Sequence, residues 1–208
     1  KGSLDRIGVE SVDLYQIHWS SPLLSPETMM EGMALCVQAG LTRTVGVSNF
    51  GQKRMLRAYS TLAQHGIPLA SNQVHYSLLS REVEKNGTLA RCKELGIRMI
   101  AYSPLEKGLL TGKYSTENPP PGPRGPQYAE RLPKLPPVLK VLTKIGQDHG
   151  GKTNSQVAMN WLIRKGALPI PGAKTAAQAL ENAGALGWKL TDAQVALLDE
   201  ASDKFSAA

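Results

Sequence analysis

The chain is poor in the features that build disulfide frameworks, membrane spans and nucleic-acid-binding surfaces. It has two cysteines, Cys36 and Cys92, without metal or redox spacing, which predicts reduced, buried thiols in a reducing compartment. No apolar run is long enough to span a bilayer, and no secretory signal opens the sequence. The net charge of +7 comes from scattered Lys and Arg without an aromatic-basic cluster, so a phosphate-bearing small ligand explains it as well as a nucleic acid does.

Length and composition indicate a soluble domain of one sizeable core. The chain has 208 residues, of which 41% are hydrophobic and 20% charged. It does not begin with Met, and its first residues, KGSLDRIG, resemble the end of a helix. We therefore expect an upstream part of the protein to be missing from this sequence.

Five apolar runs end in small or polar residues, and helical patterns follow most of them. The runs are VDLYQIHW (12–19), TVGVSNF (44–50), ASNQVHYS (70–77), RMIAYSPLEKG (98–108) and ALPIPGAK (167–174). Strands that alternate with helices indicate an α/β fold with a parallel sheet, which carries function at its strand ends. An open doubly wound sheet and the later part of an eight-stranded barrel both fit. The first run lacks a following G-x-G-x-x-G turn, and the helix-like start of the chain favours the truncated barrel.

Cap and breaker residues set the expected limits of the helices. Ser25 followed by Pro26 predicts an N-cap with Pro at the first helical position. Thr191 and Gln194 predict a capping box before a final helix. The Pro-rich stretch 118–126 is expected to exclude helix. The other expected helices cover residues 53–65, 88–95, 138–149, 155–165 and 175–185.

Together these motifs resemble those of the aldo-keto reductases, in family order and over nearly the whole chain. The matching pieces are DLYQIHW, TRTVGVSNF, NQVHYSLLSREVE, AYSPLEKGLLTGKY and IPGAKTAAQALEN. The fourth piece and the Pro-rich loop are most similar to the potassium-channel β-subunit-like and plant or bacterial branches. The resemblance implies a (β/α)8 TIM barrel that binds NADP(H). Residues 1–208 would form one N-terminally truncated domain that holds strands four to eight, an extra helix and a C-terminal helix.

The resemblance implies that the full-length protein reduces aldehydes or ketones, as small-molecule substrates, to alcohols with NADPH. Of the family's Asp, Tyr, Lys and His tetrad only the His is matched, by His18, and the other three are expected on strands upstream of this chain. His18 would orient the substrate carbonyl and help stabilise charge on its oxygen. Asp13 and Tyr15 lie on the opposite strand face and Lys1 precedes the strand, so none of them substitutes. From the residues alone, His18 could equally be packed or solvated.

Small polar residues at the strand ends are candidates for binding an amide. Ser48, Asn49 and Gln73 follow two neighbouring strands and could hydrogen-bond an amide from both sides, although helix capping or a turn would also explain them. The resemblance assigns all three to the nicotinamide carboxamide, and it assigns Tyr102 to the face of the nicotinamide ring. His75 has no matching role and is interpreted as structural.

The remaining candidates would contact the phosphates and the adenosine. A Gly-containing loop with Lys side chains can hold a pyrophosphate, and a helix N-terminus after Gly172 favours an anion. Lys174 could pair with a 2′-phosphate, which favours NADPH over NADH. A solvated loop and an ordinary polar helix face are the alternatives. The residues that the resemblance assigns here are Ser103, Leu105, Lys107, Lys113, Arg124, Gly172, Lys174, Gln178, Glu181 and Asn182, the last three on one helix face.

Two other functions stay open. One is a cofactor-binding regulatory subunit of the channel β-subunit type, and the other is a short product without activity. Part of a barrel leaves open sheet edges and an uncovered core, so we expect the isolated chain to be inactive and to be unstable or self-associate. We expect no nucleic-acid partner, no membrane span and no metal, and a location in the cytoplasm or the plastid stroma. The oligomeric state and the substrate are not indicated.

Overall fold

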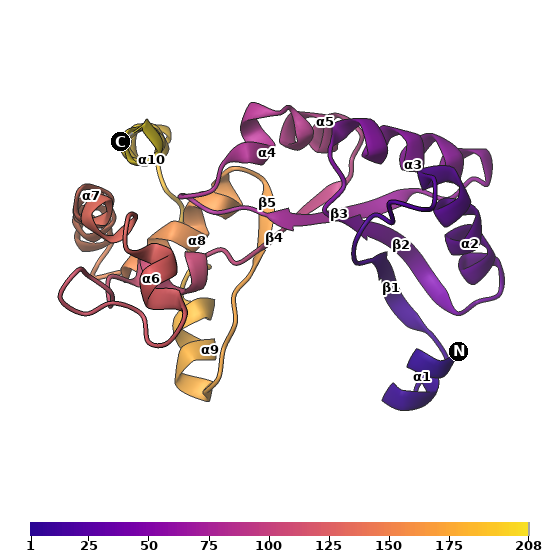
Figure 1. The fold of residues 1–208 in the computed structure, drawn as a ribbon, viewed down its shortest axis with the longest axis horizontal. Coiled ribbons are helices and arrows are strands. Elements are labelled where there is room, and N and C mark those ends of the chain that lie inside the picture. Colours follow the sequence, from indigo (N-terminus) through magenta and orange to yellow (C-terminus); the bar gives the residue numbers. More distant parts are fainter. Residues whose placement is uncertain (208) are drawn as a thin grey trace. The chain divides into compact units, whose positions relative to one another are not determined.

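The computed structural model describes residues 1–207, except for the side chain of Arg124. Its strands are β1 (Val12–Ile17), β2 (Thr42–Ser48), β3 (Leu69–His75), β4 (Arg98–Tyr102) and β5 (Ala167–Ile170), in the sheet order β1-β2-β3-β4-β5 (Figure 1). The pairs β1–β2 and β2–β3 are parallel. The five expected strands and the parallel pairing are therefore confirmed.

Helices follow β1, β2, β3 and β5, and most of their ends agree with the cap signals. Ser25 Oγ accepts a hydrogen bond from the backbone N–H of Thr28 at 3.1 Å. In the capping box, Gln194 N donates to Thr191 Oγ1 at 3.2 Å and Thr191 N donates to Gln194 Oε1 at 3.0 Å. The helices are α1 (Gly2–Ile7), α2 (Pro26–Gln38), α3 (Gln52–Gln64), α4 (Glu82–Lys85), α5 (Thr88–Glu94), α6 (Arg124–Tyr128), α7 (Leu135–Asp148), α8 (Asn154–Arg164), α9 (Ala176–Ala183) and α10 (Asp192–Ala207), with 3-10 helices η1 (Glu106–Thr111) and η2 (Leu132–Lys134).

The prediction that the Pro-rich stretch excludes helix is wrong at its end, because α6 contains Pro126. Pro126 is the third residue of α6, and Pro123 stands at the N-cap. The first backbone N–H groups of a helix have no intrahelical acceptor, so a proline there removes no helical hydrogen bond. Pro136 near the start of α7 is tolerated for the same reason.

The chain divides into two compact units. Unit 1 consists of residues 1–74 and 82–100, and unit 2 consists of residues 75–81 and the chain from residue 101 onward. In unit 1, Arg57 on α3 holds Glu27 on α2 through two hydrogen bonds of 2.7 Å. The apolar core of this unit includes Met30, Val45, Val47, Met55 and Leu62, each fully buried.

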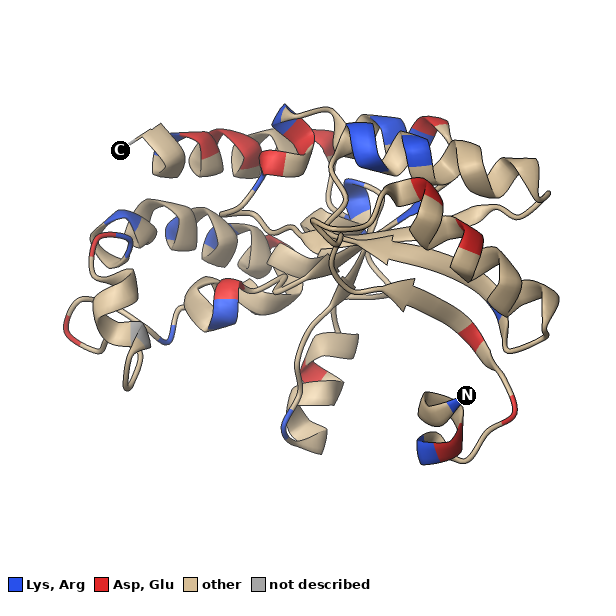
Figure 2. Cartoon of the chain, turned by 45° about the vertical axis from the view of Figure 1, so that its right-hand side comes forward, with Lys and Arg blue, Asp and Glu red and all other residues tan. Residues whose placement is uncertain are grey.

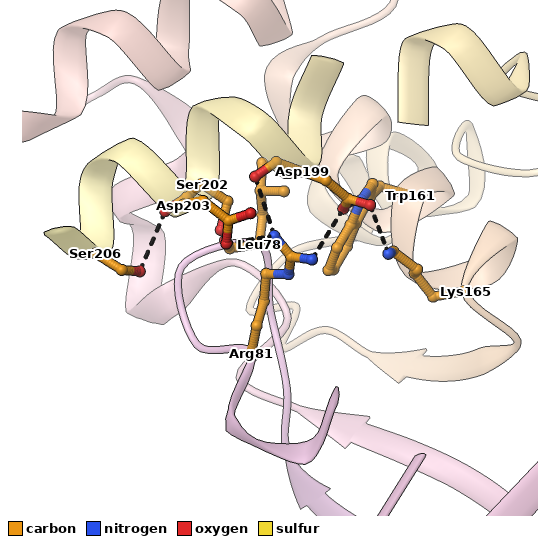
Figure 3. Close-up of polar contacts among 8 residues, drawn as sticks. All are labelled: Leu78, Arg81, Trp161, Lys165, Asp199, Ser202, Asp203 and Ser206. Carbon is orange, nitrogen blue, oxygen red and sulfur yellow. Dashed lines mark hydrogen bonds and ion pairs between the residues drawn. The ribbon is translucent and has the colours of Figure 1, made fainter. Parts of the chain in front are cut away.

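In unit 2, a carboxylate cluster joins α10 to α8 and to Arg81 (Figure 3). Asp199 accepts a hydrogen bond from Trp161 Nε1 at 2.9 Å and pairs with Lys165 Nζ at 2.7 Å. Arg81 donates to the backbone oxygen of Asp199 at 3.0 Å. These contacts hold Arg81, the last residue of the segment 75–81, against α10.

The two thiols differ in their environment. Both are free, but Cys92 is buried and Cys36 is only half-buried, so the prediction of buried thiols is right for Cys92 and wrong for Cys36. Cys36 faces partly outward because the buried face of α2 is formed by other positions, among them Met29, Met30 and Met33. Burial raises the pKa of Cys92 to about 12.

Most charged residues of both signs lie on the helices and loops (Figure 2), and the described strands carry only Asp13, Arg43 and Arg98. Several large apolar side chains are exposed instead of buried, among them Tyr15, Trp19 and Leu23. Strand β1, which contains Tyr15, is the first strand of the sheet order.

None of the described helices combines the length and the apolar composition that crossing a bilayer requires.

Candidate functional site

Four predicted site residues of unit 1 lie at the carboxyl ends of β1, β2 and β3. Ser48 pairs with Gln73 in the register of β2 and β3. His18 directly follows the last paired residue of β1. Asn49 joins the first and second strand ends, because its Nδ2 donates to the backbone oxygen of His18 at 3.3 Å. The structure therefore gathers the residues that the sequence placed at three separate strand ends.

Hydrogen bonds hold Ser48 and Asn49 in defined orientations. The buried Ser48 hydroxyl donates to the backbone oxygen of Gln73 at 2.8 Å, and Asn49 Nδ2 also donates to Ser48 Oγ at 3.1 Å. The backbone of Asn49 is left-handed, with φ of 60°, a conformation that Asn adopts more readily than most residues. The N-cap of α3 is Gly51, without a side-chain cap hydrogen bond. Helix capping by Ser48 or Asn49 is thereby excluded.

A supporting layer that the sequence reasoning missed lies one alternation below these strand ends. Gln16 on β1 and Ser71 on β3 both pair with Gly46 on the strand between them. Gln16 Nε2 donates to Ser71 Oγ at 3.0 Å across that glycine. A Cβ atom on Gly46 would stand 2.2 Å from Ser71 Oγ, so only glycine leaves room for this bond. The available signal was a glycine inside a strand pattern, which often marks a close approach.

His18 is exposed at the end of β1. Its imidazole stacks beside the indole of Trp19, with ring centroids 6.0 Å apart and an interplanar angle of 24°. The alternative of a packed histidine is thereby excluded. An exposed imidazole next to fixed amide and hydroxyl groups can hydrogen-bond an oxygen atom of a ligand.

In unit 2, Tyr102 ends β4 and has a stacked partner. The ring of His75 lies parallel to it, with centroids 5.3 Å apart and an interplanar angle of 9°. Burial, with a smaller contribution from the charge of Glu106, raises the pKa of Tyr102, so the phenol is neutral at neutral pH. His75, which the sequence suggested is merely structural, is thus a direct neighbour of a predicted site residue.

The loop after Tyr102 is built from left-handed residues. Ser103, Lys107 and Gly108 have φ of 51°, 53° and 101°. Left-handed residues within a turn aim backbone N–H groups into a concavity, which is typical of anion sites. A Cβ atom on Gly108 would lie 2.9 Å from Cε of Lys113, so glycine lets this lysine pack against the loop. Leu105 closes the turn by accepting from Gly108 N at 2.9 Å.

A buried carboxylate in this loop escaped the sequence reasoning. Glu106 is 2% exposed and has φ of 48°. Its Oε1 accepts from the Ser77 hydroxyl at 2.9 Å and lies 2.7 Å from Nε2 of His75, and its Oε2 accepts from Arg131 at 3.1 Å. Burial by itself would raise the pKa of Glu106, but the hydrogen bond and charge of His75, with Arg131 and Ser77, lower it overall. No local pattern indicates these partners, because they come from distant parts of the chain.

The residues around α9 fix the loop that precedes it. Gln178 Oε1 accepts from the backbone N–H of Lys174 at 2.6 Å, and Asn182 Nδ2 donates to the backbone oxygen of Gly172 at 3.4 Å. The side chain of Lys174 is exposed. Most of the predicted 172–182 group is therefore brought together in unit 2. The side chains of Gln178 and Asn182 hydrogen-bond the backbone of the loop before α9.

One member of the predicted set, Glu181, stands apart from that arrangement. Glu181 accepts from the hydroxyl of Thr153, the N-cap of α8, at 3.1 Å, so its carboxylate contacts α8 rather than the 172–174 loop. It thus differs from Gln178 and Asn182, with which it was expected to share one binding face. The side chain of Arg124 lies outside the described part of the chain, so its predicted contact is a matter for experiment.

Known proteins resemble the chain over nearly all of its length. The family model described as "Aldo/keto reductase family" matches residues 1–203. A chloroplastic pyridoxal reductase of Arabidopsis thaliana is 42% identical over 205 residues, which are 97% of this chain and 56% of that protein. An aldo-keto reductase of Schizosaccharomyces pombe, yakc, whose name specifies NADP(+), is 35% identical, over 97% of the chain and 60% of that protein.

Two solved structures have the same fold. A thermostable aldo-keto reductase crystallised with the inhibitor epalrestat gives a TM-score of 0.78 at 31% identity and covers 96% of this chain and 63% of that one. The glycerol dehydrogenase of Gluconobacter oxydans gives 0.85 at 28% identity, with 96% and 61% covered. The chain thus spans less than two thirds of the length of its relatives. The prediction that its strands are the later part of a (β/α)8 barrel is confirmed.

Proposed function

The chain belongs to the aldo/keto reductase family, and we propose that the full-length protein reduces aldehydes or ketones to alcohols with NADPH. The observation that carries this proposal is the polar cluster at the ends of β1, β2 and β3. There Asn49 and Ser48 are oriented by hydrogen bonds beside Gln73 and an exposed His18. Fixed donors and acceptors of this kind suit a ligand that carries an amide and a carbonyl.

The residues of unit 1 fit the nicotinamide end of such a cofactor. Ser48, Asn49 and Gln73 would hold the carboxamide, since hydroxyl and amide groups complement its donor and its acceptor. NADPH, when bound, supplies the hydride that reaches the carbonyl carbon. His18 would hydrogen-bond the carbonyl oxygen and stabilise the charge that develops on it. The Asp, Tyr and Lys of the family's tetrad would come from strands upstream of this chain, and that Tyr would donate the proton.

Unit 2 by itself offers groups that suit the phosphates, the adenosine and one ring face of such a cofactor. The left-handed loop and its lysines suit a pyrophosphate, and an exposed Lys174 beside the N-terminus of α9 suits a 2′-phosphate. Tyr102 would contact the nicotinamide ring with one face. The proposed contacts of the phosphates and the adenosine are Ser103, Leu105, Lys107, Lys113, Arg124, Gly172, Lys174, Gln178, Glu181 and Asn182.

The names of the relatives support oxidoreduction in general. The similarity to a pyridoxal reductase makes pyridoxal a reasonable first aldehyde to test, and the relative's chloroplastic name is consistent with the plastid stroma as one of two candidate compartments. The cytoplasm is the other. Both are reducing environments, which suits the free thiols of the chain.

The test is steady-state NADPH oxidation by the full-length protein with a panel of aldehydes and ketones that includes pyridoxal. Replacing His18 by Ala is expected to lower kcat by about 10²- to 10⁴-fold, the usual contribution of such a group. His65→Ala is the matched control, because His65, at the C-cap of α3, pairs with Glu31 on α2 in the same unit. Unchanged turnover in His18→Ala would refute its role. Slow turnover of the wild type together with a stable partner complex would favour the regulatory-subunit alternative.

A further inference from the structure

We propose that Glu106 is a positioning residue that sets the plane of the Tyr102 ring through His75. This rests on the proposed function, in which Tyr102 contacts the nicotinamide. Neither Glu106 nor His75 is among the residues that the family motifs assign to cofactor or substrate. The inference therefore adds a layer behind the proposed binding site.

Both the backbone conformation and the burial of Glu106 are energetically unfavourable. Its backbone is left-handed, which residues other than glycine adopt rarely. Its carboxylate is almost completely buried, which is unfavourable unless charged partners and hydrogen bonds compensate. Such combinations persist where the surroundings hold them in place, and they gather at functional sites. A glycine at this position would adopt the same turn with less strain.

The carboxylate holds the imidazole of His75 in one plane. Arg131 engages Oε2 of Glu106, and this leaves Oε1 to face Nε2 of His75 at 2.7 Å. The other ring nitrogen, Nδ1, lies 3.4 Å from the Ser80 hydroxyl. The contacts at the two nitrogens, of which the one with Glu106 is the closer, restrict the rotation of the imidazole. One face of the ring lies against Tyr102.

The fixed imidazole in turn restricts the phenol ring. The interplanar angle of 9° means that any tilt of Tyr102 would open a gap against His75 on one side. Stacked aromatic pairs lose their dispersion contact as they separate. One face of Tyr102 is therefore backed by a rigid plane, so that its opposite face offers a flat surface in a defined orientation. A flat surface of this kind is what a nicotinamide ring requires.

The test compares two ligands on the full-length protein by calorimetric titration. One is NADPH, and the other is 2′-phospho-ADP-ribose, which keeps the pyrophosphate, the 2′-phosphate and the adenosine but lacks the nicotinamide. In Glu106→Gln we expect NADPH to bind about 3- to 10-fold more weakly, since a stacked pair contributes of that order, while the affinity for 2′-phospho-ADP-ribose stays the same. His75→Ala should show the same selective loss, and Glu106→Gln should add nothing in that background. His75→Phe keeps a stacking ring but loses the Nε2 contact with Glu106, so it should bind NADPH as weakly as Glu106→Gln, and wild-type affinity in this variant would count against the role of Glu106.

The matched control is Asp199→Asn. Asp199 is another carboxylate of unit 2 with several polar partners, namely Arg81, Lys165 and Trp161. The Asp199→Asn variant should lower the midpoint of thermal unfolding, as Glu106→Gln does. The ratio of its affinities for NADPH and for 2′-phospho-ADP-ribose should stay unchanged. Equal losses for both ligands in Glu106→Gln, or additive losses in the double variant, would overturn the positioning role. A wild-type protein that binds neither ligand would refute the proposed function and the inference with it.

Discussion

Replacing Gly46 by Ala tests whether the strand ends rest on the hydrogen bond between Gln16 and Ser71. The new methyl carbon would stand 2.2 Å from Ser71 Oγ and 3.2 Å from Cγ of Gln16. The serine hydroxyl must then move by roughly 1 Å within a close-packed layer. This movement breaks the 3.0 Å bond from Gln16 Nε2.

The expected loss of stability follows from three contributions. Overpacking in a core costs about 1–3 kcal/mol. The lost hydrogen bond adds about 0.5–1.5 kcal/mol. Replacing a strand glycine returns about 0.5–1 kcal/mol through the lower entropy of the unfolded chain. The balance is a destabilisation of about 2 kcal/mol, and its sign depends on the steric contact.

Urea unfolding of the full-length protein, followed by circular dichroism, measures this balance. With a slope of about 2 kcal/mol per molar urea, Gly46→Ala should lower the midpoint by about 1 M. Gly32→Ala is the matched control, because nothing lies within 4 Å of a Cβ atom there, in the helix α2. It should raise the stability by about 0.5–1 kcal/mol, as expected from helix propensity.

A second variant separates the steric contact from other causes. Ser71→Ala alone should cost about 1 kcal/mol, the usual value of one hydrogen bond. In the Gly46→Ala background it should be neutral or stabilising, because it removes the atom that the new methyl group meets. A midpoint of Gly46→Ala at or above the wild type, or strictly additive losses in the double variant, would refute the reasoning.

Three further predictions concern thiol reactivity, pH and association. Cys36 should react with an aromatic disulfide reagent in the native state while Cys92, whose pKa burial raises to about 12, reacts only after unfolding; comparable rates for both thiols would contradict the burial of Cys92. The pKa of Glu106 is lowered from 4.5 in the folded state, so its stabilising contribution is present above pH 4.5 and is lost as the pH falls through the folded pKa. Below pH 4.5 the urea midpoint should therefore fall less steeply in Glu106→Gln than in the wild type. Parallel curves would show that the carboxylate is not linked to folding. The isolated 208-residue chain, which exposes Trp19 and Leu23, should elute in gel filtration above its monomer mass in a concentration-dependent manner, and a monomer that unfolds cooperatively would disprove this.

The secondary structure was largely predictable because its signals are local. Ser25 and the Thr191–Gln194 capping box act on residues within one helical turn, and both appear where the pattern placed them. The error at α6 arose from treating all prolines of the stretch 118–126 as helix breakers, whereas Pro126 occupies the first turn of α6. Cys36 was misjudged because helical periodicity alone does not decide which positions of α2 face its neighbours.

The positions of the candidate residues at the strand ends were predictable, but the hydrogen bonds among them were not. The strand-end rule selected His18, Ser48 and Gln73 as candidates, because parallel strands present their carboxyl ends at one edge. It did not indicate that Asn49 bridges two of these ends, or that Gly46 makes space for a bond across the middle strand. Such features depend on which residues stand side by side in the sheet register.

The sequence alone determined the order of the five strands, most of the helices, the family, and the strand ends at which the candidate residues lie, since periodicity, caps and motifs act over short distances along the chain. Only the tertiary structure decided how those residues are held. Glu106 finds Ser77 and Arg131 at separations of 29 and 25 residues, and no spacing rule links them. The reason is that burial of a charge is favourable only with partners that the whole fold assembles, so the chemistry of Glu106 could not be inferred before its surroundings were known.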